Sequence, residues 1–333
     1  MTSASKSEDP AQAASSQPPA RGGRSFGDKV YLALTWASAV LVLVILGAII
    51  VMLIHGSLPA LRKFGFFHFL TSAAWNPVRE EFGALSPIVG TLVSSLIAIV
   101  IGLPVSFGIA LFITELAPVW LKRPVGVAIE LLAAIPSIIY GMWGLFIFAP
   151  FFAEHIQPLL ENTLGRVPGL GIFFQGLPLG ISVFTAGVVL AIMIVPFIAS
   201  VMRDVFETVP RELRESAYGV GCTTWEVVWK VIMPVTKVGV VGGIMLGLGR
   251  ALGETMAVTF VIGNSHELNA ALFMPGNSIA STIANEFTEA DGEIYTSALI
   301  SLGLILFIIT FIILSLAKFM LIRMARAQEG RSA

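Results

Sequence analysis

Residues 30–54 read VYLALTWASAVLVLVILGAIIVMLI and contain no charged side chain, which decides the class of fold. A helix needs about 20 consecutive apolar residues to cross the hydrocarbon core of a bilayer, so this run predicts a membrane-spanning helix. Continuous apolar runs recur along the chain and argue against a transmembrane β-barrel, whose strands alternate apolar and polar residues. The sequence therefore predicts an all-α integral membrane fold with six spans. The predicted spans are residues 30–54, 87–113, 125–152, 177–201, 238–263 and 295–322.

The composition supports this class and excludes several others. Of the 333 residues 12% are charged, about half the ~25% that a soluble domain carries. The net charge of −1 offers no basic surface for nucleic acid. The single cysteine, Cys222, and four scattered histidines give no metal motif and no internal disulfide. There is no P-loop and no nucleophile–base pair within the spans, so we expect no enzyme activity, no metal site and no bound cofactor in this chain.

The distribution of lysine and arginine predicts the orientation in the membrane. With the N-terminus in the cytoplasm, 15 of the 20 basic residues fall in cytoplasmic segments. The opposite side holds Arg62, Lys63, Arg79 and Arg166, and one arginine lies within a span. This asymmetry predicts that both termini are cytoplasmic. The sequence also predicts a disordered tail over residues 1–28, a six-helix domain over 29–325, an outer-face interfacial helix within 62–86 and a short cytoplasmic tail over 326–333.

The longest cytoplasmic loop spans about residues 202–237 and includes RDVFETVPRELRESAYGVGCTTWEVVWKVIMPVTK. Pro210 suits the start of one short helix, and Thr223 or Thr224 suits the N-cap of a second. Trp225 and Trp229 lie four residues apart and share a helical face. By these residues alone the loop is either a solvated segment with interfacial tryptophans or an element that docks into a cytoplasmic partner.

The fifth predicted span, VGVVGGIMLGLGRALGETMAVTFVIG, contains two charged residues, Arg250 and Glu254. Arg250 lies 13 residues after Lys237, about 20 Å of helical rise and near the middle of the bilayer. A charge there costs about 2.5–3.5 kcal/mol on insertion scales, so it normally faces a wet cavity or a partner. Either Arg250 and Glu254 form a self-neutralising structural pair, or Arg250 faces a translocation path and meets an anion while Glu254 orients it.

The third predicted span offers weaker candidates for the same path. Glu130 lies near the cytoplasmic interface, where it could pair or reach the interface without any transport role. Ser137 and Tyr140 follow Pro136 in AAIPSIIYGMWG, where a proline-broken turn either exposes backbone to a cavity or kinks the helix. Pro104 and Pro196 should kink the second and fourth spans.

Part of the cytoplasmic loop resembles the EAA loop of ABC-importer permeases. The matching residues are Glu215-Ser216-Ala217, then Gly221, then Val231-Ile232-Met233-Pro234, with the spacing of the family pattern intact. Ser216, Val231 and Met233 replace the usual Ala, Ile and Leu. The resemblance implies a type I ABC-importer permease fold. It also implies that this loop sits in a cleft of an ATPase subunit and that Glu215, Ala217, Gly221 and Pro234 belong to the docking segment.

Four further stretches resemble the permease subunits of bacterial phosphate-specific (Pst) ABC importers. They are WNPVREEFGALSPIVGTL at 75–92, ELLAAIPSIIYGMWG at 130–144, GRALGETMAVTFVIGN at 249–264 and IASTIANEF at 279–287. The run GETMAVTFVIGN favours one of the two sister permeases of that importer over the other.

The resemblance implies inorganic phosphate as cargo and a heteromeric assembly. The implied partners are a second permease (PstA-like), an ATPase dimer (PstB-like) that binds ATP and Mg, and a periplasmic phosphate-binding protein (PstS-like). The residues alone do not separate phosphate from sulfate, molybdate or phosphonate. They also leave open a proton-coupled secondary carrier that uses Glu254 or Glu130, although such a carrier has no need of a docking loop.

Overall fold

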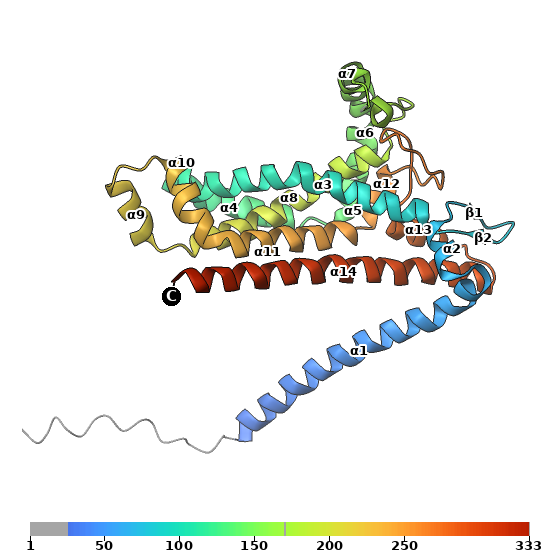
Figure 1. Ribbon diagram of the computed structural model, residues 1–333, viewed down its shortest axis with the longest axis horizontal. Helices are drawn as coiled ribbons and strands as arrows, with labels where there is room; N and C mark the ends of the chain where they lie inside the picture. The colour runs from blue at the N-terminus through green and yellow to red at the C-terminus, as the bar shows by residue number, and fades with distance from the viewer. Residues whose placement is uncertain (1–25, 170, 333) are drawn as a thin grey trace, which may run out of the picture. The chain divides into compact units, whose positions relative to one another are not determined.

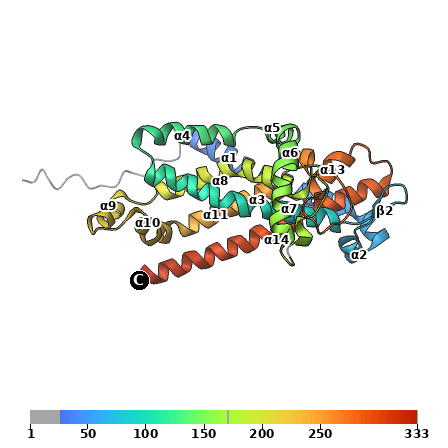
Figure 2. The same ribbon diagram turned by 90° about the horizontal axis from the view of Figure 1, so that it is seen from above.

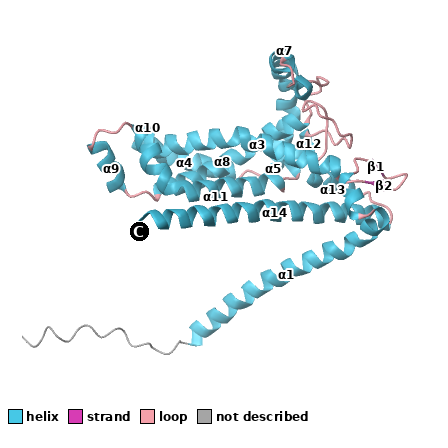
Figure 3. Cartoon of the chain, in the orientation of Figure 1, coloured by secondary structure: helices cyan, strands magenta, loops and turns pink. Residues whose placement is uncertain are grey.

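The computed structural model describes residues 26–169 and 171–332, which form helices joined by short loops and one small hairpin (Figures 1 and 3). Six helical stretches are long and apolar enough to span a membrane. They are Phe26–Phe64, Leu85–Leu116, Ser137–Arg166, Val183–Glu207, Thr224–Leu252 and Glu293–Arg323. The prediction of an all-α membrane fold with six spans is confirmed.

The chain divides into two parts at residue 52, and each part is described by itself. Helix α1 (Phe26–Phe64) provides the described residues of the first part and ends in the second. Residues 26–28 are helical, so the predicted disordered tail is wrong for them, because the apolar run supports helix up to its edge. The rest of that predicted tail, residues 1–25, lies outside the described residues.

The second part contains the remaining elements. Helices and strands before the centre of the chain are α2 (Phe66–Thr71), β1 (Trp75–Asn76), β2 (Glu81–Phe82), α3 (Leu85–Leu111), α4 (Val119–Ala133), α5 (Ser137–Trp143), α6 (Ala149–Phe151) and α7 (Gln157–Thr163). Those that follow are α8 (Val183–Glu207), α9 (Arg211–Gly219), α10 (Thr224–Val227), α11 (Met233–Leu252), α12 (Met256–Val261), α13 (Ile279–Glu286) and α14 (Glu293–Ser332). Strands β1 and β2 are antiparallel, with Trp75 opposite Phe82.

Helix α8 forms the centre of this second part. Its Leu190, Ile194 and Ile198 are fully buried, and α3, α4 and α11 pack around it. Small residues allow the close approach that these contacts need. A Cβ added at Gly187 of α8 would lie 2.6 Å from Ile97 of α3, and one added at Gly247 of α11 would lie 2.5 Å from Ile198. Glycines at the crossings therefore set how closely the central helices pack.

Several buried hydroxyl groups are satisfied within their own helices. Thr91 donates to the carbonyl of Pro87 at 2.8 Å, Ser106 donates to that of Gly102 at 2.6 Å, and Thr236 donates to that of Ile232 at 2.7 Å. Each of these bonds reaches back four residues within one helix. Ser106 also bonds to the carbonyl of Val195 on α8 at 3.2 Å, and the Thr91 hydroxyl also accepts the N–H of Ile279 at 2.9 Å.

The third and fifth spans were predicted as continuous helices, and this is wrong because the helix breaks inside each of them. The third breaks between α4 and α5, where Pro136 stands at the N-cap of α5 and cannot continue the hydrogen-bond ladder of α4. The fifth starts earlier than predicted, at Thr224, and α11 ends at Leu252. The fourth begins at Val183 and not at 177, because the Ser182 hydroxyl accepts a hydrogen bond from the Thr185 N–H and caps α8.

The two ends of this part differ in their elements. Helices α9 and α10 lie at one end, together with the C-terminal end of α14, and the β1–β2 hairpin and α13 lie at the other (Figures 1 and 2). The predicted C-terminal tail continues as helix through Ser332. Helices α9 and α10 and the C-terminal end of α14 thus share one end of this part.

Candidate functional site

The two helix breaks are followed by short helices, α5 and α12, that pack against each other. Their closest approach is at Gly141 of α5. A Cβ added there would lie 2.9 Å from the ring of Phe260 and 3.1 Å from the Cα of Ala257, so α12 leaves no room for a side chain. Interrupted helices with close-packed halves inside an apolar span are a common way to present polar backbone within a membrane.

Arg250 lies in the last turn of α11, immediately before the second break. Its side chain is exposed, and the centre of its guanidinium lies 5.6 Å from the centroid of the Phe197 ring on α8. No ion pair joins Arg250 to any carboxylate in the part of the chain that the structure describes. A cation near a helix C-terminus is favoured by the helix dipole, and a ring face adds a cation–π contact. The guanidinium therefore keeps its hydrogen-bond donors free for a ligand.

Glu254 lies in the break and not on the face of α11 that carries Arg250. Helix α11 ends at Leu252 with Gly253 as its C-cap, so the expected one-turn spacing between Arg250 and Glu254 does not exist. The Glu254 carboxylate accepts a hydrogen bond of 3.2 Å from the N–H of Ala257 at the start of α12. The self-neutralising pair is therefore not formed among these described residues.

Tyr140 bridges the first break. Its hydroxyl donates a hydrogen bond of 2.9 Å to the carbonyl of Leu132 at the end of α4, which also accepts the N–H of Ile135 at 3.3 Å. Tyr140 also lies within electrostatic range of Arg250. Ser137 begins α5 after Pro136 and is half-buried. The structure thus brings Tyr140 and Arg250 into one region, with Tyr140 tied to the backbone.

Glu130 lies away from this region, in a charged depression at the side of α4. Its carboxylate forms an ion pair of 2.8 Å with Arg203 of α8, and Arg203 also pairs with Asp204. Lys122 and Glu207 line the same depression. The pairing hypothesis for Glu130 therefore has a partner in the structure.

The loop of residues 202–237 folds into the two short helices that the sequence predicts. Helix α9 follows Pro210 and ends at Gly219, and Gly221 adopts a φ of +94°, which only glycine takes without strain. A capping box then starts α10. The Thr223 hydroxyl accepts the N–H of Glu226 at 3.3 Å, and the Glu226 carboxylate accepts the N–H of Thr223 at 3.0 Å.

This loop exposes apolar and charged side chains together. Glu215 is exposed, Ala217 is half-buried, and Pro234 is exposed at the start of α11. The Trp225 and Trp229 rings lie 5.5 Å apart, and the side chain of Trp225 is 66% exposed. The predicted docking residues are therefore gathered on one segment at one end of the chain.

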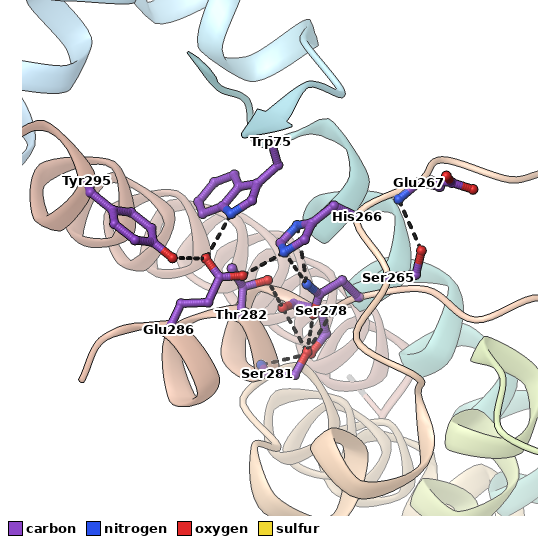
Figure 4. A network of polar contacts seen from close by, with 10 residues as sticks. Trp75, Ser265, His266, Glu267, Ser278, Ser281, Thr282, Glu286 and Tyr295 are labelled. Carbon is purple, nitrogen blue, oxygen red and sulfur yellow. Dashed lines mark hydrogen bonds and ion pairs between the residues drawn. The ribbon is translucent and has the colours of Figure 1, made fainter. Parts of the chain in front are cut away.

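A polar cluster at the opposite end was not predicted from the sequence (Figure 4). The carboxylate of Glu286, on α13, accepts hydrogen bonds from Trp75 Nε1 at 2.8 Å, from the Tyr295 hydroxyl at 2.7 Å and from His266 Nε2 at 2.6 Å. The rings of His266 and Trp75 stack in parallel, with their centroids 5.0 Å apart. We call these four residues the Glu286 cluster. The resemblance of residues 75–92 and 279–287 to one family was the signal that could have pointed to it.

The environment of Glu286 opposes and favours ionisation at once. Burial works to raise the pKa of its carboxyl, but the hydrogen bonds from His266, Tyr295 and Trp75 outweigh burial and hold the pKa below its ordinary value. The carboxylate is therefore the ionised centre of the cluster. It joins the β1–β2 hairpin, α13, α14 and the loop after α12.

Comparison with known proteins places the chain in one family. Residues 102–326 match the family described as binding-protein-dependent transport system inner membrane component. A phosphate transport system permease protein PstC of Pasteurella multocida is 61% identical over 88% of this chain and 91% of its own length. One of Mesorhizobium japonicum is 58% identical over 89% of this chain and 90% of its own length. The sister permease that GETMAVTFVIGN favours is PstC, so the predicted resemblance is confirmed.

Solved structures support the fold. A chain of a bacterial alginate ABC transporter, crystallised with an alginate-bound periplasmic protein, superimposes with a TM-score of 0.58. The identity is 18%, with 88% of this chain and 94% of that chain covered. The chain thus has the fold of an ABC-importer permease. It belongs to the family of binding-protein-dependent transport system inner membrane components.

Proposed function

We propose that this chain is a permease subunit of an ATP-driven importer that carries inorganic phosphate across the bacterial inner membrane. The proposed route runs from a periplasmic binding protein to the cytoplasm. The names of the 58–61% identical relatives support phosphate as the cargo. The charge distribution supports an orientation with both termini, α9 and α10 in the cytoplasm.

The observation that carries the proposal is the exposed, irregular backbone beside Arg250. Ala134, Pro136 and Gly253 lie in the two helix breaks, and all three are exposed in this chain. These residues directly flank the apolar stretches Ser137–Arg166 and Thr224–Leu252, and we place them within the membrane. Irregular backbone does not face lipid there, because its unpaired polar groups would go unsatisfied. This face therefore borders a water-filled path or a second protein. A path shared with a second, related permease meets both conditions.

Arg250 supplies the chemistry that an anionic cargo needs. Its planar guanidinium can give two parallel hydrogen bonds to the oxygens of a phosphate, and its contact with Phe197 leaves those donors unused. Glu254 stands in the adjacent break and limits how tightly an anion is held, which allows release. Tyr140 keeps the first break in place through the Leu132 carbonyl.

The two ends of the chain suit the two kinds of partner. The exposed loop of α9 and α10 docks into an ATPase dimer, which binds ATP and Mg and supplies the energy, because this chain has no P-loop. The end that carries the β1–β2 hairpin and α13 faces the periplasm and receives the phosphate-binding protein.

The test is phosphate uptake by the complete reconstituted complex with Arg250→Gln in this subunit. The matched control is Arg323→Gln, because Arg323 on α14 also rests on a ring, that of Phe319 at 4.6 Å, but lies outside the proposed path. We expect the Arg250 variant to assemble and hydrolyse ATP, but to take up phosphate at least about tenfold more slowly, which corresponds to one lost charged hydrogen-bonding group. Uptake near the wild-type rate would remove Arg250 from the path.

A further inference from the structure

Helix α9 has little of its own to hold it in place. It contains no buried residue, and most of its side chains are exposed and polar. A short polar helix gains little stability from propensity alone, so its position must come from specific contacts. In the described chain, one charged residue of α9, Arg214, reaches back to the membrane helices.

Arg214 contacts two different helices at once. One guanidinium nitrogen, Nη1, lies 2.9 Å from Oε1 of Glu115, and the other, Nη2, donates a hydrogen bond of 2.5 Å to the carbonyl of Phe206. Glu115 lies in the π-helical turn that ends α3, and Phe206 lies in the last turn of α8. The side chains of Glu115 and Arg214 are 5% and 17% exposed. This is a largely buried ion pair between the loop helix and the end of α3, and α3 packs against α8.

The pair is positioned for mechanical contact more than for stability. Glu115 Oε1 and Arg214 Nε are both buried and lack a hydrogen bond of good geometry. A buried pair with unsatisfied atoms recovers little of its desolvation cost, so it is poor at adding stability. It does fix the place of α9, because moving either charge away would leave the other buried without a partner.

The anchors of the pair lead to the centre of the molecule. Lys122 donates to the carbonyl of Thr114, the neighbour of Glu115, which fixes the turn between α3 and α4. Helix α8 carries both Phe206, beside Arg214, and Phe197, beside Arg250. A displacement of α9 is thus passed to α3 and α8 through short contacts, and α8 runs to the proposed phosphate path.

We infer that Arg214 and Glu115 are a positioning pair that transmits movement of the ATPase-docking helix to α3 and α8. The inference rests on the proposed function, since it takes α9 as the docking helix. It predicts that breaking the pair separates ATP hydrolysis from transport, and that the complex still assembles.

The experiment compares Glu115→Gln and Arg214→Lys in the complete reconstituted complex. Gln keeps the shape of Glu115 without its charge, and Lys keeps the charge of Arg214 but cannot reach both of its partners. The readout is the number of phosphate ions taken up per ATP hydrolysed, together with the yield of assembled complex. We expect this ratio to fall about tenfold in both variants, a typical size for lost coupling between sites.

The matched control is Arg323→Gln, which removes an exposed charge that rests on the Phe319 ring of α14, outside both α9 and the proposed path. Its ratio should equal that of the wild type. An unchanged ratio in either assembled pair variant would overturn the inference, and so would loss of assembly in both, which would make the pair purely structural. If the wild-type complex itself moved no phosphate, the proposed function would fail instead.

Discussion

The Glu286 cluster and the α9–α10 loop are both rich in aromatic and charged residues, but the cluster buries these side chains and the loop exposes them. In the Glu286 cluster the carboxylate receives three hydrogen bonds, and the side chains of Glu286 and His266 are only 17% and 22% exposed. In the loop, Trp225 and Val220 are 66% and 88% exposed.

This difference distinguishes a region whose contacts are made within the chain from a region that exposes surface for a partner. The cluster satisfies its polar groups within one chain, so its residues serve the fold of that end. The loop satisfies its backbone through the Thr223 capping box but leaves large apolar side chains uncovered. An exposed apolar surface bordered by charged side chains is typical of a protein interface.

The largest expected effect is a loss of stability when the carboxylate of the Glu286 cluster is removed. Glu286→Ala leaves the donors of Trp75, His266 and Tyr295 without an acceptor, and should lower the free energy of unfolding by about 3 kcal/mol. Thermal unfolding of the purified chain in detergent measures this. Glu286→Gln keeps an acceptor oxygen and should cost clearly less. Equal losses in the two variants would show that the hydrogen bonds are not what stabilises this end.

The next effect tests the loop. Trp225→Ala should leave thermal unfolding of the isolated chain nearly unchanged and weaken binding of the ATPase by about 2 kcal/mol, or roughly thirtyfold. Binding of purified ATPase to the chain in nanodiscs measures it. Trp120→Ala is the control, because Trp120 on α4 is also exposed, at 74%, but lies outside the loop. A similar loss of binding in both variants would count against a specific docking surface.

The third prediction concerns Gly221, which lies in the same loop. Because its φ is +94° and an added Cβ would meet nothing within 4 Å, the cost of Gly221→Ala is backbone strain alone, about 1–2 kcal/mol. We expect fewer phosphate ions to be taken up per ATP hydrolysed, because the angle between α9 and α10 changes. Gly219→Ala adds the same methyl group at an ordinary φ, and uptake by that variant should stay near the wild-type value.

The smallest expected effect is a pH dependence confined to the cluster. The pKa of Glu286 is lowered in the folded chain, so its contribution to stability is present above the unfolded pKa of about 4.3 and is lost as the pH falls through the folded value. Unfolding temperatures measured from pH 6 down to pH 3 should fall more steeply for the wild type than for Glu286→Gln. Parallel curves would contradict the lowered pKa.

Short-range chemistry could be predicted from the sequence and long-range contacts could not. Pro210, Gly221 and Thr223 act through residues within a few positions, and the loop folds as those rules predict. Trp75 and Glu286 are 211 positions apart, so no local pattern brings them together. The resemblance of both stretches to one family was the available signal.

The candidate path shows the same limit. Arg250 could be found from the sequence because it is a charged residue in an apolar span. Its expected position one helical turn from Glu254 was wrong, because that expectation assumed an unbroken helix. Helix α11 ends with Gly253 as its C-cap, and the sequence does not separate this glycine from the packing glycines before it. The contact of Arg250 with Phe197 depends on how α8 and α11 pack.

The self-satisfied hydroxyl groups have a consequence for how the protein is made. A span whose Thr or Ser already bonds to its own carbonyl, as Thr91 and Ser106 do, can enter the bilayer alone during synthesis. Helix α11 cannot do so as easily, because Arg250 has no partner in its own helix. Helix α8 leaves the ribosome first and offers the Phe197 ring and a surface fitted to Gly247. The order of the chain thus gives the helix that carries Arg250 a neighbour that is already in the membrane. Exchanging these two segments in sequence should impair membrane insertion before it impairs transport.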